Sequence, residues 1–297
     1  MEDRDWLAQR FEQDRVRLRA VAYRMLGSFA EADDAVQEAW IRLARSDSDA
    51  IENLSGWLTT VVGRVCLDML RSRKSRREDP MDWHVPDPVV EPITASDPEH
   101  EAELADSVGL ALLLVLDTLS PAERLAFVLH DMFDVPFQDI ALMLDRSTDA
   151  TKMLASRARR RLRNSPTEPD ADLAQQQRVV DAFFAAARAG DIEALVNVLA
   201  PDIVVRADGS PGRPHFNSMT RGAEAVASRA MTFANPKAVL HPALVNGSAG
   251  VVVTINGHPF SILSFTVVHG KIVAIEGISD PDRMAASLEA SGFELTH

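Results

Sequence analysis

The sequence predicts a multidomain chain in which two all-helical parts precede an α+β domain. Apolar residues recur every three or four positions over 6–77 and over 107–163, which is the spacing of one helix face. Beyond residue 203, short β-rich runs alternate with Asn-Gly and His-Gly turns, which is typical of an antiparallel sheet. The expected parts are two helical domains at 1–77 and 107–164, linkers at 78–106 and 165–172, and an α+β domain at 173–297.

The first helical part reads as three helices. Apolar residues from Phe11 to Leu26 form one face, and Gly27-Ser28 ends that helix. Acidic residues at 31–34 open a second helix, where the helix dipole favours negative charge. Ser55 is the expected N-cap of a third helix that runs through Arg73.

The second helical part ends in a predicted helix-turn-helix. Leu119-Ser120-Pro121-Ala122-Glu123 has Ser as N-cap, Pro at the first helical position and Glu at the third. A short helix at 137–144, a turn at 145–147 and a second helix at 148–163 follow. Residues 152–163 carry six basic side chains and no acidic one, so this last helix is suited to DNA.

The linker at 78–106 is strongly acidic. Its 29 residues carry ten carboxylates without a Lys or Arg, and five prolines (80, 86, 88, 92, 98) preclude a long helix before about residue 99. Such a segment is extended or poorly ordered in isolation. The seven residues before it, 71–77, include five basic ones. The acidic linker therefore joins two basic stretches, and the net charge of −13 does not exclude local DNA-binding patches.

Composition excludes several other classes of protein. The single cysteine, Cys66, rules out an intramolecular disulfide framework. The longest apolar run, 108–116, is far shorter than the roughly 20 residues of a membrane span. The N-terminus lacks the basic and apolar stretches of a signal peptide. We expect a cytoplasmic protein that does not enter a membrane, and no motif predicts a metal or another cofactor.

The α+β part combines two helices with several strands. The helices are expected near 173–188 and 191–199. The expected strands are 203–207, 238–245, 250–255, 260–268 and 271–278.

The helical parts resemble an extracytoplasmic-function (ECF) sigma factor of the sigma-70 family. Residues 32–38, followed by Trp40, resemble the region 2 helix that docks on the polymerase clamp. Gly56-Trp57-Leu58 with Leu67-Asp68 resembles the helix that opens and reads the −10 promoter element. Residues 119–161 resemble region 4, which reads the −35 element. The resemblance implies core RNA polymerase and promoter DNA as partners.

The remainder resembles the SnoaL-like domain that one subgroup of these factors carries in place of a separate anti-sigma protein. Residues 83–88, 208–213 and 280–284 are similar to three marks of that subgroup, each with departures from its pattern. The resemblance implies an intramolecular regulatory contact between this domain and the sigma regions. The residues assigned to it are Trp83, Pro86, Asp87, Pro88, Asp208, Gly209, Arg213 and Asp282.

Three further groups of site residues follow from the resemblance and from helix geometry. Asp34, Gln37 and Glu38 share one helix face and are expected to bind core polymerase. The residues expected at the −10 element are Asn53, Trp57, Arg64, Asp68 and Arg71. Those expected at the −35 element are Ser147, Thr148, Thr151, Lys152, Arg157, Arg160 and Arg161, with Thr151 and Lys152 as base contacts.

An enzyme is the alternative for the α+β domain. SnoaL-like cones include cyclases and isomerases, and Asp208, His215, His241, His258 and His269 are available for proton transfer. No pair of them has a spacing that marks an acid–base couple. We therefore expect no enzymatic activity, and the sequence leaves open whether the domain binds a small ligand. The alternative function is a ligand-binding or enzymatic cone tethered to DNA-binding modules, but such a protein has no use for an intact region 2 pattern.

Overall fold

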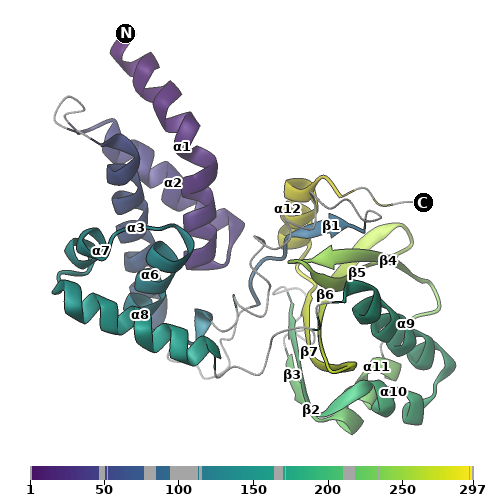
Figure 1. Cartoon of the computed structure of the whole chain (residues 1–297). Coiled ribbons are helices and arrows are strands. Elements are labelled where there is room, and N and C mark those ends of the chain that lie inside the picture. Colours follow the sequence, from purple (N-terminus) through teal and green to yellow (C-terminus); the bar gives the residue numbers. More distant parts are fainter. Residues whose placement is uncertain are drawn as a thin grey trace. The chain divides into compact units, whose positions relative to one another are not determined.

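The computed structural model divides the chain into two units, residues 1–83 with 113–165 and residues 84–112 with 166–297 (Figure 1). The described residues are 2–46, 51, 53–76, 85–93, 113, 116–163, 170, 172–209, 218–232, 234–293 and 295. No helix among these residues is long and apolar enough to cross a lipid bilayer. The predicted domain boundaries themselves stay a prediction.

Three helices of the first unit pack together as the apolar spacing predicts. They are α1 (Glu2–Leu26), α2 (Phe29–Leu43) and α3 (Leu54–Arg76). Leu18, Met25 and Ala35 are fully or almost fully buried between them. The N-cap prediction for α3 is wrong, because Asn53 Oδ1 accepts from Gly56 N at 3.0 Å. Ser55 lies inside the helix and donates its hydroxyl to Asp14 at 2.6 Å.

The rest of the first unit is helical too. It consists of α6 (Pro121–Phe127), the π-helical turn η2 (Val128–Met132), α7 (Phe137–Leu144) and α8 (Thr148–Arg163). The predicted capping of α6 is confirmed, since Glu123 N donates to Ser120 Oγ at 3.3 Å and Ser120 N donates to the Glu123 carboxylate at 3.0 Å. Asp145, with φ of 52°, ends α7 in the left-handed conformation and makes the turn of the predicted helix-turn-helix.

Helix α3 also packs on α6 and α7. Gly63 of α3 permits the close approach, because a Cβ there would lie 3.3 Å from both Leu129 and Met143. Arg124 of α6 is 2% exposed, forms an ion pair with Asp117 and donates to the carbonyl of Arg24 in α1. Two helical segments far apart in sequence therefore share a buried interface.

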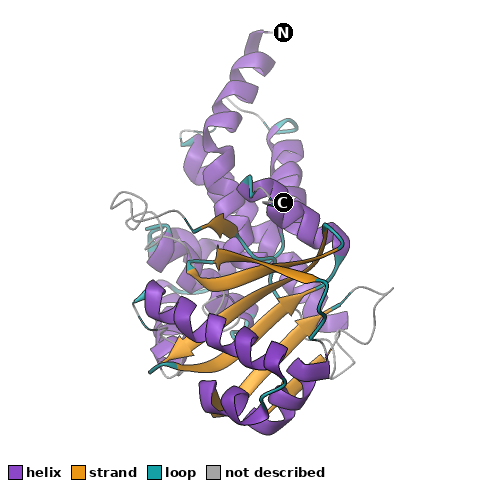
Figure 2. Cartoon of the chain, turned by 90° about the vertical axis from the view of Figure 1, so that its right-hand side faces the viewer, coloured by secondary structure: helices purple, strands orange, loops and turns teal. Residues whose placement is uncertain are grey.

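The second unit is an α+β cone built on a seven-stranded sheet (Figure 2). The strand order is β1-β4-β5-β6-β7-β2-β3, and β2 with β7 is the parallel pair. The strands are β1 (Val90–Pro92), β2 (Leu199–Asp208), β3 (Ser218–Arg221), β4 (Ala238–Val245), β5 (Ser248–Ile255), β6 (His258–Val268) and β7 (Lys271–Ile278). The helices are α9 (Leu173–Ala189), α10 (Ile192–Val198), α11 (Ala223–Thr232) and α12 (Pro281–Ser291).

The core of the cone lies between the sheet and the helices α9, α10 and α11. Phe183 of α9 and Phe265 of β6 meet edge to face, with ring centroids 5.8 Å apart. The three predicted turns at 246–247, 256–257 and 269–270 have positive φ at both residues, as two-residue hairpin turns of type I′ require. Sequence analysis did not predict β1, β3, α11 or α12, and β1 lies inside the segment expected to be a linker.

Candidate functional site

The predicted polymerase-docking face lies on α2. Asp34 and Gln37 are exposed, while Glu38 is half-buried and pairs with Arg42 one turn later, at 2.8 Å. A depression of about 240 Å³ beside this face, between α1 and α2, is lined by Gln37, Trp40 and neighbouring side chains. These residues are available to a partner, and their contact with polymerase stays a prediction.

The residues predicted at the −10 element have different local roles. Asn53 is exposed and caps α3 through its side chain, and Trp57 is half-buried. Asp68 and Arg71 form an exposed pair at 3.6 Å. Arg64 donates to the carbonyl of Leu142 in α7 at 3.1 Å, so in this structure its guanidinium contacts the helix-turn-helix.

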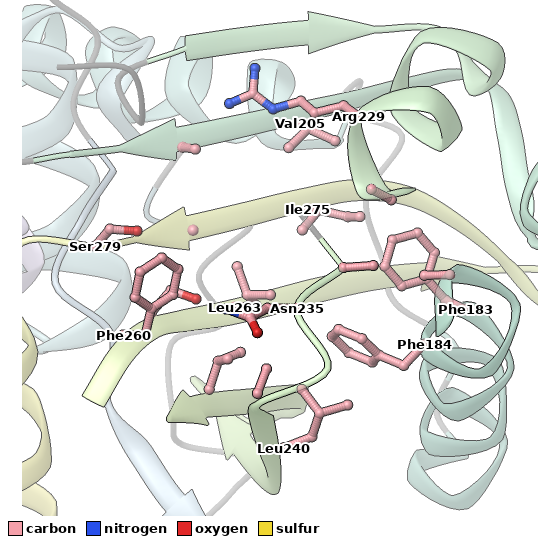
Figure 3. Close-up of a pocket in the computed structure, with 18 of the residues that line it drawn as sticks. Phe183, Phe184, Val205, Arg229, Asn235, Leu240, Phe260, Leu263, Ile275 and Ser279 are labelled. Atoms are coloured by element: carbon pink, nitrogen blue, oxygen red, sulfur yellow. The ribbon is translucent and has the colours of Figure 1, made fainter. Parts of the chain in front are cut away.

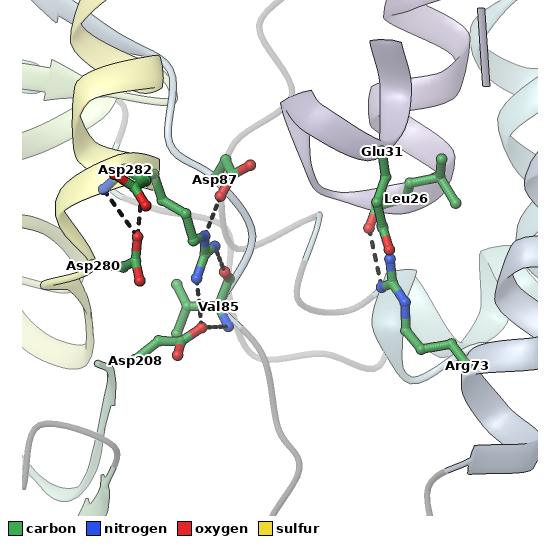
Figure 4. Close-up of polar contacts among 9 residues, drawn as sticks. Leu26, Glu31, Arg73, Val85, Asp87, Asp208, Asp280 and Asp282 are labelled. Carbon is green, nitrogen blue, oxygen red and sulfur yellow. Dashed lines mark hydrogen bonds and ion pairs between the residues drawn. The ribbon is translucent and has the colours of Figure 1, made fainter. Parts of the chain in front are cut away.

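The basic stretch 71–77 includes one structural residue within its described part. Arg73 forms an ion pair with Glu31 of α2 and donates to the carbonyl of Leu26 in α1 at 3.3 Å (Figure 4). Its guanidinium thus joins the end of one helix to the start of the next. The side chains of residues 74–77 lie outside the described residues.

The helix-turn-helix requires one correction at its predicted base contacts. Thr151 is fully buried, and its hydroxyl donates to the Ser147 carbonyl at 3.1 Å, so its side chain does not reach a base edge. The prediction that Thr151 reads DNA is wrong, because it lies in the buried stripe of α8 with Leu154, Ala155 and Ala158. Lys152, by contrast, is exposed.

The remaining predicted −35 residues are largely accessible. Ser147 Oγ accepts from Ala150 N at 3.2 Å and so caps α8, and Thr148 is half-buried at its start. Arg157 and Arg160 are exposed. Met153 and Ser156, which sequence analysis did not select, are exposed as well. Ser156 lies four residues after Lys152 and so shares its face of α8, and that spacing was a signal for it.

Arg161 is held by the protein as well as exposed. It donates to Glu123 of α6 at 3.1 Å, and 53% of its side chain is accessible while Glu123 is 7% accessible. Burial opposes ionisation of Glu123, but hydrogen bonds from Ser120 and the charge of Arg161 hold the pKa of this carboxyl below its usual value. Arg161 therefore stabilises α8 against α6 in addition to its predicted phosphate contact.

In the second unit, a guanidinium clamps the linker onto the cone (Figure 4). Arg283, at the start of α12, donates Nε to Asp87 at 2.5 Å, Nη1 to Asp208 at 2.7 Å and Nη2 to the carbonyl of Val85. Val85 N donates in turn to Asp208 at 3.2 Å. We call these four residues, Val85, Asp87, Asp208 and Arg283, the linker clamp.

Backbone pairing extends the clamp along the linker. Val89 N donates to Asn246 Oδ1 and Asn246 N donates to Val89 O, each at 2.8 Å. Val90 N donates to Ser291 Oγ at 3.1 Å, and β1 pairs with β4 in antiparallel register. Residues 85–88 and Val90 are buried. The segment 85–93 is therefore an integral edge of the cone.

The predicted regulatory residues lie in different surroundings. Asp87 and Asp208 lie in the linker clamp, and Pro86 and Pro88 are buried beside it. Gly209 is half-buried next to Asp208, and Trp83 and Arg213 lie outside the described residues.

The assignment of Asp282 to the regulatory contact stays a prediction. Its side chain is exposed, and its backbone N donates to the capping Asp280 at 3.1 Å. Its neighbour Arg283, which sequence analysis did not select, bonds to Asp87, Asp208 and Val85. The opposite charges of Asp87 and Arg283, in two segments singled out by the resemblance, were the available signal.

A buried carboxyl lies under the clamped linker. Glu276 of β7 accepts from Arg206 at 3.1 Å through one oxygen, and its other oxygen has no hydrogen-bond partner among the described residues. Val85, Pro86 and Pro88 pack around the sheet face that carries it. Burial raises the pKa of Glu276 to about 7, against the lowering effect of Arg206.

The candidate acid–base residues of the cone do not converge. His241 is 9% exposed and bonds to Thr254 at 3.0 Å, while His258 and His269 are exposed at two of the hairpin turns. Asp208 is engaged in the linker clamp, and His215 lies outside the described residues. The geometry therefore points to the clamp as the principal polar site of the described cone.

Comparison with known proteins covers almost the whole chain. Residues 11–76 match the family model of sigma-70 region 2, and residues 109–162 match that of sigma-70 region 4. The ECF RNA polymerase sigma factor SigJ of Mycobacterium tuberculosis is 36% identical over 291 residues, which cover 93% of each chain. The probable ECF RNA polymerase sigma factor SigI of the same species is 34% identical over 288 residues, covering 96% of this chain and 97% of that one. The crystal structure of M. tuberculosis SigJ matches with a TM-score of 0.71 over 93% of this chain and 98% of that chain.

Proposed function

The chain belongs to the extracytoplasmic-function sigma factors, and we propose that it directs promoter-specific initiation by core RNA polymerase under the control of its own α+β cone. The exposed face of α2 docks on core, and α3 with the residues before it engages the −10 element. Helix α8 enters the major groove at the −35 element. Exposure of Asp34, Lys152 and Arg157 supports these roles.

Initiation requires the first unit to open. The −10 and −35 elements are about 25 base pairs apart, which is roughly 85 Å, since B-DNA rises about 3.4 Å per base pair. In the present form, α3 packs directly on α6 and α7, and Arg64 bonds to Leu142. In this arrangement α3 and α8 cannot both reach their promoter elements. We therefore assign the arrangement to the protein before it engages a promoter.

The cone controls initiation by holding the linker. The acidic segment 78–106 is expected to thread the positively charged channel of polymerase near the active site and RNA exit path. Residues 85–93 cannot do so while they form β1 and the linker clamp. The observation that carries this proposal is the three-way contact of Arg283 with Asp87, Asp208 and Val85.

Transcription with purified core polymerase tests the proposal. We expect Arg283→Ala, and a chain that ends at Asn164, to initiate more often per bound factor than the full chain. Arg178→Ala is the matched control, because Arg178 is 68% exposed and its nearest acidic partner, Asp172, is 3.9 Å away. Equal initiation by all four proteins would refute control by the cone, and lower initiation by Arg283→Ala would make the clamped linker the active form.

A further inference from the structure

A largely apolar cavity lies inside the cone, on the opposite sheet face from the linker (Figure 3). Its volume is about 200 Å³, and it lies between the sheet and the helices α9 and α11. Phe183 and Phe184 line one end, and Phe260 and Ser279 line the other. An apolar cavity of this size deprives its walls of packing contacts, so a ligand that fills it is bound favourably.

The size of the cavity limits the ligand. An engineered apolar cavity of about 150 Å³ holds benzene, so about 200 Å³ holds roughly eight carbon atoms in the same manner. The cavity is partly open, which allows a head group to remain at its rim. A compact hydrocarbon chain or ring with one polar end fits this shape.

Charge determines the head group. The charged side chains among the described lining residues are Arg188, in the last turn of α9, and Arg229, in the last turn of α11. Arg229 Nη1 donates to Thr220 at 3.3 Å, which orients its guanidinium at the rim. A guanidinium binds a carboxylate through paired hydrogen bonds. We propose that the cavity binds an amphipathic monocarboxylate of about eight carbons and that this ligand regulates the linker clamp.

The sheet itself connects the cavity to the clamp, because successive side chains of a strand point to opposite faces. Val205 and Ala207 of β2 line the cavity, whereas Asp208 is in the clamp. On β7, Ile275 and Gly277 line the cavity, whereas Glu276 lies under the linker. A ligand therefore packs against the back of β2, which carries Asp208 of the clamp, and against the back of β7, whose Glu276 lies under the linker.

The end of β7 adds a second connection. Ser279 lines the cavity, and its backbone N donates to the Asp208 carbonyl at 2.9 Å. The next residue, Asp280, caps α12 and so positions Arg283. A filled cavity holds both strand ends in the geometry that the clamp needs, so ligand binding and linker docking favour each other. By linkage, the clamped linker strengthens ligand binding by the same factor.

The test uses octanoate as the probe and the full-length protein. Calorimetry compares octanoate with octanol, which has the same chain but no charge, in the wild type and in Arg229→Gln. We expect octanoate to bind the wild type at least about tenfold more tightly than octanol, and Arg229→Gln to weaken the binding of octanoate but not that of octanol, because a hydrogen bond to a charged group is lost while Arg188 remains. Arg178→Gln, with its exposed side chain on another face of α9, should bind octanoate as the wild type does. Octanoate binding no tighter than octanol, or no binding of either, overturns the proposal.

Hydrogen exchange provides the regulatory readout. Octanoate should slow exchange of the Val89 and Val90 amides, which bond to Asn246 and Ser291. Ala230 lines the cavity, so the leucine side chain of Ala230→Leu should fill it. In this variant octanoate should not change the exchange of these amides, and thermal melting verifies that the variant folds. Octanoate binding with unchanged exchange refutes the regulation.

Because the regulation rests on the proposed function, Arg283→Ala without ligand is measured in parallel. If Arg283→Ala changes initiation but octanoate does not bind or does not change exchange, the proposed function stands and the ligand proposal fails. If octanoate binds but Arg283→Ala initiates as the wild type does, control by the clamp is refuted.

Discussion

Removing Arg283 should release the linker from the cone. Its side chain is 20% exposed, and the partner carboxylates of Asp87 and Asp208 are 4% and 12% exposed. Breaking a buried ion pair by removing one partner costs about 3–5 kcal/mol, because an uncompensated charge stays behind. Undocking lets Asp87 regain water, so the lower value of about 3 kcal/mol is appropriate to Arg283→Ala. At about 1.4 kcal/mol per factor of ten, the ratio of docked to free linker falls about 100-fold.

Hydrogen exchange measures this ratio directly. The amides of Val85, Val89 and Val90 donate to Asp208, Asn246 and Ser291, so each is protected only while the linker is docked. We expect their exchange to accelerate about 100-fold in Arg283→Ala and less in Arg283→Lys, which keeps the charge but lacks the planar fork. Amides in the core of β5 should exchange as in the wild type, which shows that the cone remains folded.

The reasoning would be refuted by unchanged exchange at Val89 and Val90. A change below about threefold in Arg283→Ala would place the guanidinium contribution near that of an exposed ion pair. The Arg178→Ala control should leave the exchange of these amides unchanged, because its exposed ion pair with Asp172 is not part of the linker clamp. The double variant with Asp87→Ala adds a check, since two residues that act through one contact have non-additive effects.

Three further perturbations have defined outcomes. Glu276 binds its proton more tightly in the folded cone (pKa about 7) than when unfolded (4.5), so its contribution to stability worsens as pH rises from about 4.5 to 7, by up to about 3 kcal/mol. In urea unfolding, the free energy of unfolding of Glu276→Gln should increase relative to that of the wild type as the pH rises across that range. A difference between the two that does not change with pH would contradict this. Burial raises the pKa of Cys66 to about 12, so its reaction with a thiol reagent at pH 8 should be slowed at least about 1,000-fold until urea unfolds the protein, whereas rapid labelling would disprove its burial. Lys152→Ala should weaken initiation at a cognate promoter about tenfold or more with core binding intact, and loss of core binding would refute the assignment of α8 to DNA.

Local patterns sufficed for the helical parts because local interactions determine them. The apolar spacing of α1 and α2, the capping box of Ser120 and the hairpin turns act within a few residues, and each is confirmed. Thr151 could have been excluded by the same reasoning, because residues 151, 154, 155 and 158 form one buried stripe. The prediction for Thr151 was wrong because it used the position of the residue along the helix and not the helix face that carries its side chain.

The linker clamp could not be derived from local patterns. Val85 and Arg283 are separated by 198 residues, and β1 exists only because β4 offers an edge for pairing. A proline-rich acidic segment is expected to be unstructured when its partner is not considered. Burial of Val85, Pro86, Pro88 and Val90, together with the charge of Arg283, supplies the stabilisation that the segment lacks alone.

Locking the linker in place is the most direct test of control by the cone. Val90 and Val245 are buried register partners of β1 and β4, so the double change Val90→Cys and Val245→Cys, with Cys66→Ala, places a disulfide across the pair. The account predicts that the oxidised protein binds core polymerase but initiates far less than the reduced protein, and that reduction restores initiation to the Cys66→Ala level. Equal initiation by the oxidised and reduced forms would contradict it.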